Sequence, residues 1–306
     1  MIYPKYQGKP IYKTESLSRT LSLPLWKLRK LAKNSDEYYF PSPKFKKDGS
    51  TRMVYRIREP LKTTLKEIKS VILDRVRYPD YLHGSIRGRS PETNAEVHAG
   101  GTRIIVVDIA NFFPSVKDQD IYRICRYFLN FSEEVSILLV KLITYQDLLP
   151  QGSPVSSSIA NLALCWDGKE SRLVESLRQK GLRYTRYMDD IAISYTKRLQ
   201  REEETAIIKK VHAFVRNKGF QLNHSKTKVL NPIKAKTITG LKVSRKIGIP
   251  SQYIESVFQE IKQLKSRNSF DEQDIASIEG KINHIRRHNP KKACHLEGYL
   301  PWCVSK

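Results

Sequence analysis

The sequence predicts a mixed α/β (α+β) fold in which an antiparallel sheet is covered by helices. Three observations support this prediction. Residues 184–195 form two short runs of aromatic and β-branched side chains that meet at adjacent acids, as the strands of a hairpin do. Residues 102–109 form an apolar run typical of a buried strand, and amphipathic helical patterns fill much of the remaining sequence. With 306 residues, 40% of them hydrophobic, the chain can build two or three substructures around a sizeable core.

The composition is strongly basic. Lys and Arg total 55 against 31 Asp and Glu, which gives a formal net charge of +24. Such an excess indicates a polyanionic partner, and nucleic acid is favoured over an anionic membrane. The sequence contains no apolar run near the roughly 20 residues of a membrane span, no signal-peptide core at its N-terminus and no Cys-x-x-Cys spacing. We therefore expect a cytoplasmic, soluble protein with reduced thiols and no membrane partner.

The first hundred residues predict helices and one basic hairpin. Amphipathic patterns begin after Pro24 and after Pro60. Between them, Asp48-Gly49 separates two strand-like runs, which is a strong hairpin signal. The arms of this hairpin carry cations suited to contact phosphates, namely Lys44, Lys46, Lys47 and Arg52.

A basic loop with interspersed glycines follows at residues 82–91. Arg87 and Arg89 suit a phosphate backbone, and a flexible connection is an equally good interpretation of this loop. It leads to His98, which on its own is more often a satisfied structural histidine than a catalytic one.

The second half of the chain alternates helices, a shaped loop and strands. Residues 148–154 place two prolines around a glycine directly before a helix at Ser156, and a loop entering a helix N-terminus is a natural site for phosphate or sugar. The other patterns are amphipathic helices over 121–128, 135–142 and 207–215, a strand pair over 236–249, and two helices over 254–264 and 275–285 whose end is basic.

Three carboxylates stand at the ends of the predicted strands. Asp189 and Asp190 occupy the hairpin turn, and such an acidic pair, taken alone, more often faces water than binds a metal. Asp108 ends a buried strand, where an unpaired carboxylate is costly. If the strands share one sheet, the three acids can hold two Mg²⁺ ions roughly 4 Å apart, as phosphoryl transfer requires, although Asp108 and Asp189 alone could suffice.

Two further side chains fit the same chemistry. Phe113, five positions after Asp108, can block the 2′ side of a sugar and so favour deoxynucleotides. Lys226, on a nearby strand, can protonate a leaving group as a general acid.

These strings together resemble the polymerase motifs of reverse transcriptases, in the same order along nearly the whole chain. The strand ending in Asp108 with Phe112-Phe113 resembles the first palm motif, and Tyr187-Met188-Asp189-Asp190 resembles the signature hairpin. The remaining matches are Leu149-Pro150-Gln151-Gly152-Ser153-Pro154 for the template- and nucleotide-positioning loop, Leu222-Asn223-His224-Ser225-Lys226-Thr227 for the lysine motif, and the basic hairpin up to Arg52 for the fingers.

The resemblance implies a right-hand polymerase with fingers, an antiparallel-sheet palm and a helical thumb. It places fingers at residues 1–100 and 118–155, palm at 101–117 and 156–245, and thumb at 246–306. The implied catalytic residues are Asp108, Asp189, Asp190 and Lys226, with the three acids holding two Mg²⁺ ions. The implied nucleotide-binding residues are Arg52, Ile109, Phe113, Gln151 and Gly152.

The resemblance extends to bacterial retron reverse transcriptases. Residues 94–98 match their Asn-Ala-x-x-His element, and Ile238-Thr239-Gly240 resembles their Val-Thr-Gly element, whereas Met188 stands where bacterial relatives usually have Ala. This implies a structured non-coding RNA as template and primer, a branched RNA-linked DNA product, deoxynucleoside triphosphates as substrates, and an effector protein in antiphage defence. The RNA contacts are then expected at Lys44, Arg87, Arg89, Asn94 and His98.

Three alternatives remain open. A group II intron or abortive-infection reverse transcriptase shares the motifs, but the first is expected to carry an added RNA-binding domain for which 306 residues leave no room. A non-catalytic RNA-binding protein on this scaffold would be expected to lose at least one of the three acids. A metal-dependent nuclease has no need of Phe113 or the loop at Gln151.

Overall fold

The computed structural model describes residues 2–45, 49, 51–197, 199–223, 225–230, 237–267, 271–300 and 302. The expected phosphate contacts of Lys46 and Lys47, the Asp48 turn position, and the His224 position of the lysine motif lie outside the described residues.

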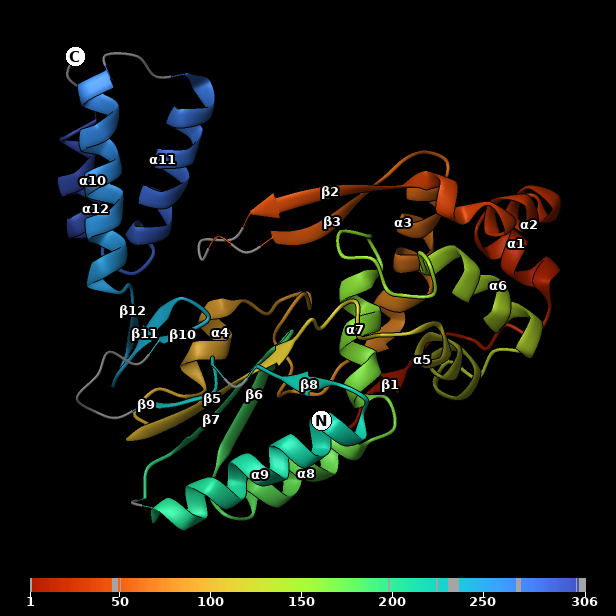
Figure 1. Cartoon of the computed structure of the whole chain (residues 1–306), viewed down its shortest axis with the longest axis horizontal. Helices are drawn as coiled ribbons and strands as arrows, with labels where there is room; N and C mark the ends of the chain where they lie inside the picture. The colour runs from red at the N-terminus through yellow and green to blue at the C-terminus, as the bar shows by residue number, and fades with distance from the viewer. Residues whose placement is uncertain are drawn as a thin grey trace.

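A five-stranded antiparallel sheet forms the centre of the molecule (Figure 1). Its strands are β5 (Arg103–Ala110), β6 (Arg183–Tyr187), β7 (Asp190–Tyr195), β8 (Gln221–Leu222) and β9 (Lys228–Leu230). β5 is the central strand, since it pairs with β7 on one side and with β8 and β9 on the other. The hairpin predicted over 184–195 is confirmed as β6 and β7, joined by a tight turn.

The helices that follow β7 and precede β6 lie side by side along the sheet. They are α8 (Lys169–Arg178) and α9 (Arg201–Asn217), drawn below the sheet in Figure 1. α9 carries the predicted apolar stripe, with Ile207, Val211 and Val215 buried. These helices bury one face of the sheet.

The N-terminal half is mainly helical, and most of it gathers on the side opposite the C-terminus, whereas α4 lies beside the small C-terminal sheet (Figure 1). Its helices are α1 (Thr14–Thr20), α2 (Leu25–Lys33), η1 (Ser35–Tyr38), α3 (Leu61–Val71), η2 (Leu73–Arg75), α4 (Pro91–Glu96), α5 (Asp118–Arg123), the π-helical segment η3 (Ile124–Phe128), α6 (Glu133–Ile143) and α7 (Ser156–Cys165). Its strands are β1 (Lys5–Tyr6), paired with β4 (Val76–Arg77), and β2 (Tyr39–Phe45), paired with β3 (Thr51–Ile57). The β2–β3 pair is the predicted basic hairpin, and it extends toward the C-terminal helices.

The C-terminal region is a small sheet followed by a helical bundle. The sheet contains β10 (Thr237–Ile238), β11 (Leu241–Val243) and β12 (Ile247–Gly248), and the bundle contains α10 (Ser251–Arg267), α11 (Glu272–Arg286) and α12 (Pro290–Glu297). α12 was not predicted as a helix of its own, because its sequence was interpreted as the basic end of the preceding helix. It buries only Ala293 and Leu296, so it has almost no apolar stripe to detect.

Two apolar clusters hold these regions together. The larger one joins the N-terminal helices to the central sheet, and the smaller one joins the C-terminal bundle to Ile104 and Ala192 of that sheet. Both regions are therefore anchored on the strands that carry the acids. Among the described residues, the structure contains no helix with the length and hydrophobicity needed to traverse a lipid bilayer.

Candidate active site

The sheet register brings the three predicted acids together. Asp108, near the end of β5, is paired with Asp190, the first residue of β7. Side chains directly opposite each other in an antiparallel pair project from the same face. Two backbone hydrogen bonds fix the surrounding turns: Ile109 N donates to Asp189 O at 3.0 Å, and Asn223 N donates to Asp108 O at 2.8 Å.

The electrostatics of this cluster fit a bound cation. Burial, together with the nearby Asp189 and Asp108 carboxylates, raises the pKa of Asp190 to about 7. Burial also raises the pKa of Asp189, and Asp108 acts in the same direction. Partly buried carboxylates that repel one another are stabilised by a divalent ion, and their oxygens are the ligands that hard cations prefer. Asp108, Asp189 and Asp190 therefore have the right chemistry to hold metal.

Lys226 lies beside these acids. Its Nζ is 3.2 Å from Asp108 Oδ2, and its side chain is 55% exposed. The hydrogen bond to Asp108 raises the pKa of Lys226, so the ammonium form is favoured. The predicted general acid is thus charged and borders the carboxylates.

The β2–β3 hairpin reaches the same cluster. Arg52 on β3 is close enough to lower the pKa of Asp189. Lys44 is its register partner on β2, and both side chains are exposed. An exposed guanidinium near Asp189 has the charge and the donor geometry that suit the phosphates of a nucleotide.

The Gln151 loop is docked on β3. Tyr55 N donates to Gln151 O at 2.7 Å, and Ser156 Oγ donates to Pro150 O at 2.7 Å. Gly152 adopts φ +109°, and a Cβ there would lie 2.7 Å from Tyr55 O. Only glycine therefore fits this approach between loop and hairpin.

Two predicted nucleotide-binding residues have different environments. Phe113 is half-buried and packs edge-on against Phe112, with ring centroids 5.8 Å apart. Ile109 is 1% exposed, and its N–H is used by the Asp189 turn. Ile109 thus supports the turn from the core, whereas Phe113 is partly accessible.

A buried ion pair that sequence reasoning missed holds the acidic turn. Arg186 is fully buried; its Nε lies 2.6 Å from Glu170 Oε1, and its Nη2 lies 3.0 Å from Glu170 Oε2. Arg186 Nη1 also donates to Met188 O at 3.0 Å, within the turn. Met188 itself has φ +58°, and the bound carbonyl fixes this strained conformation. An arginine inside an apolar strand was the available signal, because such a charge requires a buried partner.

Three of the predicted RNA contacts point into the protein instead. His98 is fully buried, with Nδ1 2.8 Å from Ser194 Oγ and Nε2 2.8 Å from Thr185 Oγ1. Asn94 is 1% exposed, and Arg89 Nη1 donates to the carbonyls of Pro79 and Leu82. These side chains organise the loop and the β6–β7 hairpin, so this geometry does not support RNA contacts for them. Arg87 and Lys44 are exposed and remain candidates.

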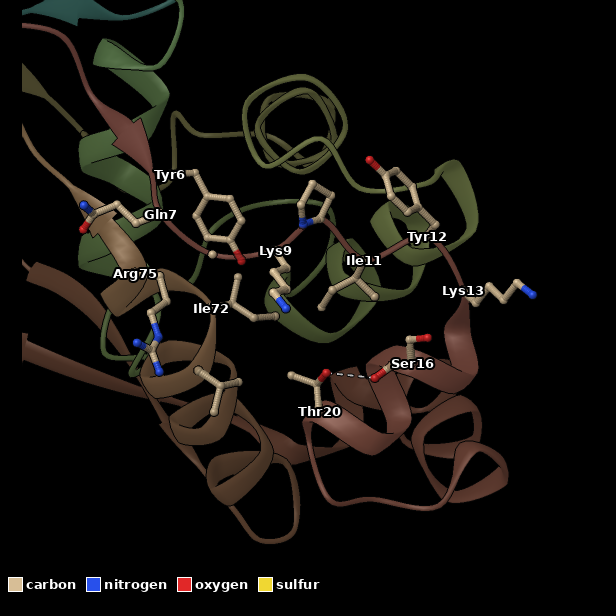
Figure 2. A pocket seen from close by; sticks show the side chains of 13 residues that line it. Tyr6, Gln7, Lys9, Ile11, Tyr12, Lys13, Ser16, Thr20, Ile72 and Arg75 are labelled. Carbon is tan, nitrogen blue, oxygen red and sulfur yellow. Dashed lines mark hydrogen bonds between the residues drawn. The ribbon is translucent and has the colours of Figure 1, made fainter.

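A separate cavity lies among the N-terminal elements (Figure 2). It has a volume of about 680 Å³, and its lining includes Tyr6, Lys9, Tyr12, Lys13 and Arg75. None of the described residues that line it is acidic. The cavity therefore has no part in the carboxylate cluster.

The sequence matches the family described as "Reverse transcriptase (RNA-dependent DNA polymerase)" over residues 43–269. This range contains the three acids, Lys226, Arg52 and the Gln151 loop. The chain belongs to the reverse transcriptase family. The resemblance that its motifs indicated, and the mixed α and β fold expected with it, are confirmed.

Curated proteins that are similar to this chain include several retron reverse transcriptases. The chain is 34% identical to Retron Se72 reverse transcriptase of Salmonella heidelberg (strain 579083-10), over 81% of this chain and 65% of that protein. It is 30% identical to Retron Mx162 reverse transcriptase of Myxococcus xanthus, over 75% of this chain and 53% of that protein. It is 26% identical to Retron Ec86 reverse transcriptase of Escherichia coli, over 97% of this chain and 86% of that protein. The chain thus spans less than two thirds of the first two relatives.

A solved structure of a foamy viral protease-reverse transcriptase dRH in complex with ds DNA is also similar. The match has a TM-score of 0.44 and 16% identity, and it covers 84% of this chain and 38% of that one.

Proposed function

We propose that this protein is an RNA-directed DNA polymerase of the retron type, which extends a primer with deoxynucleotides by two-metal phosphoryl transfer. The observation that carries the proposal is the convergence of Asp108, Asp189 and Asp190 with a charged Lys226 and with Arg52 of the β2–β3 hairpin. A cluster of acids bordered by two cations from separate elements fits a nucleoside triphosphate held by metal.

The three carboxylates would hold two Mg²⁺ ions. Bound there, such ions lower the pKa of an attacking 3′-hydroxyl and neutralise the charge on a departing pyrophosphate. Rigid strands β5 and β7 present Asp108 and Asp190 in register, which keeps the oxygen ligands in place before the metal arrives.

The protein groups around the acids then have distinct tasks. Lys226 carries a proton that it can give to the leaving group, because Asp108 stabilises its ammonium form. Arg52 binds the triphosphate, and the Gln151–Gly152 loop, fixed to β3, positions the template and the incoming nucleotide. Phe113 excludes the 2′-hydroxyl.

The partners follow from the retron relatives. The proposed template and primer is a structured non-coding RNA, and the product is a branched RNA-linked single-stranded DNA (msDNA). Lys44 and Arg87, both exposed cations, are proposed RNA contacts. We further propose that the RNA–DNA product acts with an effector protein in antiphage defence.

Asp189→Asn tests the catalytic assignment. The substitution keeps the size of the side chain and removes its charge, so incorporation of labelled deoxynucleotides on an RNA template in Mg²⁺ should fall to background while RNA binding persists. Glu279→Gln, which neutralises an exposed acid on α11, serves as the matched control and should retain full incorporation.

Normal polymerisation by the Asp189→Asn protein would show the metal assignment to be wrong. RNA binding without incorporation by the unsubstituted protein would favour a non-catalytic RNA-binding role. Sequencing of the nucleic acid that co-purifies with the protein tests the retron assignment, which requires RNA covalently linked to DNA.

A further inference from the structure

A second cluster of metal-ligating side chains lies apart from the three catalytic acids. It consists of Glu92 on α4, His284 on α11 and His288 just beyond the end of α11. One ligand atom from each residue lies within 4.8 Å of the other two. In Figure 1 the end of α11 approaches α4, so the cluster joins the C-terminal bundle to the element that precedes β5.

His288 has an unsatisfied polar atom that faces this cluster. Its side chain is only 8% exposed, and Nε2 has no hydrogen-bond partner among the described residues. Glu92 Oε1 lies 3.6 Å away, beyond hydrogen-bond distance. A buried nitrogen without a partner destabilises the folded protein, so its presence points to a ligand.

The surrounding residues orient the three ligands. His284 and His288 are four positions apart and therefore occupy one face of the helical segment, with ring centroids 5.8 Å apart. Tyr253 of α10 packs edge-on against His284 at 5.7 Å and limits the rotation of that ring. Hydrogen bonding to Ser90 and the proximity of His288 lower the pKa of Glu92, which keeps the carboxylate ionised.

We propose that Glu92, His284 and His288 form a binding site for one divalent cation of the zinc class, which ties α11 to α4. Two imidazole nitrogens and one carboxylate oxygen suit zinc, whereas magnesium prefers oxygen ligands alone. Three protein ligands leave one tetrahedral position open for water or a further ligand.

Zinc binding would require only a small change in the distances between the ligand atoms of the three residues. Ligand atoms about 2.0–2.2 Å from a tetrahedral zinc ion lie roughly 3.4 Å from one another. The Glu92–His288 separation of 3.6 Å already agrees with this value, and a rotation of one partly exposed side chain closes the remaining gap.

An ion at this site would affect how the C-terminal bundle is held against α4. Pro91, next to Glu92, accepts a hydrogen bond from Thr239 Oγ1 at 3.3 Å, so α4 already contacts the β10–β11 turn. Glu92 also contributes to the raised pKa of Tyr187, the residue that precedes the acidic turn. A cation at Glu92 would therefore fix the bundle beside the hairpin that carries Asp189.

The test is zinc binding by the full chain after removal of metal with a chelator. Calorimetric titration with Zn²⁺ in excess Mg²⁺, which occupies the three catalytic acids, should give one zinc per chain in a Cys294→Ser background that removes an exposed thiol. His288→Ala should abolish this binding, and Glu92→Gln should weaken it by more than the roughly 10- to 100-fold that loss of an outer-shell partner costs. His295→Ala, an exposed histidine on α12, should bind as the parent does.

Zinc should also raise the thermal unfolding midpoint of the parent and of His295→Ala, but not of His288→Ala, since a ligand stabilises the state that binds it. Equal zinc affinity in the parent and Glu92→Gln would overturn the proposal, and Glu92→Gln decides the question even if His288→Ala does not fold. Absence of zinc binding by the parent would reduce the cluster to an ion pair. Because the readout is binding, the result is independent of polymerase activity.

Discussion

Phe113 is the residue that we propose selects the sugar of the incoming nucleotide. Phe113 comes five residues after Asp108 of β5, and its ring packs against Phe112. The Phe112 ring packs in turn on Phe220, with ring centroids 5.6 Å apart. Phe113→Ala removes the ring without touching a charged group. We expect the kcat/KM for ribonucleotides relative to deoxynucleotides to rise at least about 10-fold in single-nucleotide incorporation assays, because the steric block to the 2′-hydroxyl is lost.

Tyr127→Ala provides the control for this measurement, since Tyr127 is 65% exposed on the π-helical segment η3. The ratio should be unchanged in that protein. An unchanged ratio in Phe113→Ala as well would exclude Phe113 as the gate.

His98 makes folding stability sensitive to acid. Burial, together with the nearby Arg183, lowers the pKa of His98 to about 3. The unfolded chain, with a histidine pKa near 6.5, binds the proton first, so stability falls as the pH drops from about 6.5 toward 3. His98→Gln cannot take up this proton and should show a shallower loss of the urea unfolding midpoint over the same interval.

His212→Gln is the control for this pH series, because His212 is only partly buried on α9, and the acid response of this variant should match that of the parent. Parallel pH profiles for His98→Gln and the parent would contradict the assigned burial effect.

The sequence predicted the roles of some individual residues better than those of others. Asp108 was identifiable because a carboxylate at the end of an apolar strand is costly wherever that strand is buried. A structural role for His98 was the more common interpretation of the residue on its own, but its partners Thr185 and Ser194 could not be identified, since they lie on strands far along the chain. The partners of Glu92 on α11 are equally remote in sequence.

At the scale of elements, the β6–β7 turn depends on an approach from the 82–91 loop. A Cβ on Gly84 would lie 2.5 Å from Met188 N, and Gly84 O accepts a hydrogen bond from Asn161 Nδ2 at 2.8 Å. Asn161 also binds Arg186. Gly84→Ala should therefore shift the acidic turn, lower the free energy of unfolding by about 1–3 kcal/mol and reduce nucleotide incorporation more than RNA binding.

Chemical denaturation and primer extension measure the two effects. Gly248→Ala is the matched control, because a Cβ on that residue of β12 meets no atom within 4 Å. Full activity and stability of Gly84→Ala would show that the turn tolerates displacement.

Local patterns predicted the elements that bury a clear stripe or meet at a recognisable turn. The hairpin at 184–195 and the helix α9 are examples. The short helix α4 begins with a Ser90–Thr93 capping box that sequence reasoning passed over, and α12 is mostly exposed. The attachment of the Gln151 loop to β3 depends on tertiary packing. The sequence motif therefore suggested a role for the loop but could not predict which residues it contacts.

For the whole molecule, the central sheet that carries the acids is flanked by elements from both ends of the chain. The β2–β3 hairpin extends over the sheet from one side, and the C-terminal bundle stands on the other (Figure 1). The apolar clusters anchor both on the same strands. Arg52 and Lys226, which come from separate elements, thus border one carboxylate cluster, as the proposed polyanionic substrate requires.

The net charge of +24 leads to the last prediction, on salt dependence. RNA that neutralises many cations releases counterions, so the association constant should fall linearly with salt concentration on logarithmic axes, by about 10³-fold or more between 50 and 200 mM if six or more phosphates are contacted. Fluorescence anisotropy with a structured RNA measures the slope.

Arg87→Gln, which removes an exposed cation, should reduce the slope of this salt dependence by about 1. Arg89→Gln should instead lower the unfolding midpoint, because Arg89 binds the carbonyls of Pro79 and Leu82. A flat salt response would refute a phosphate-dominated interface, and equal effects of the two substitutions on the slope would show that Arg89 leaves its carbonyl partners to bind RNA.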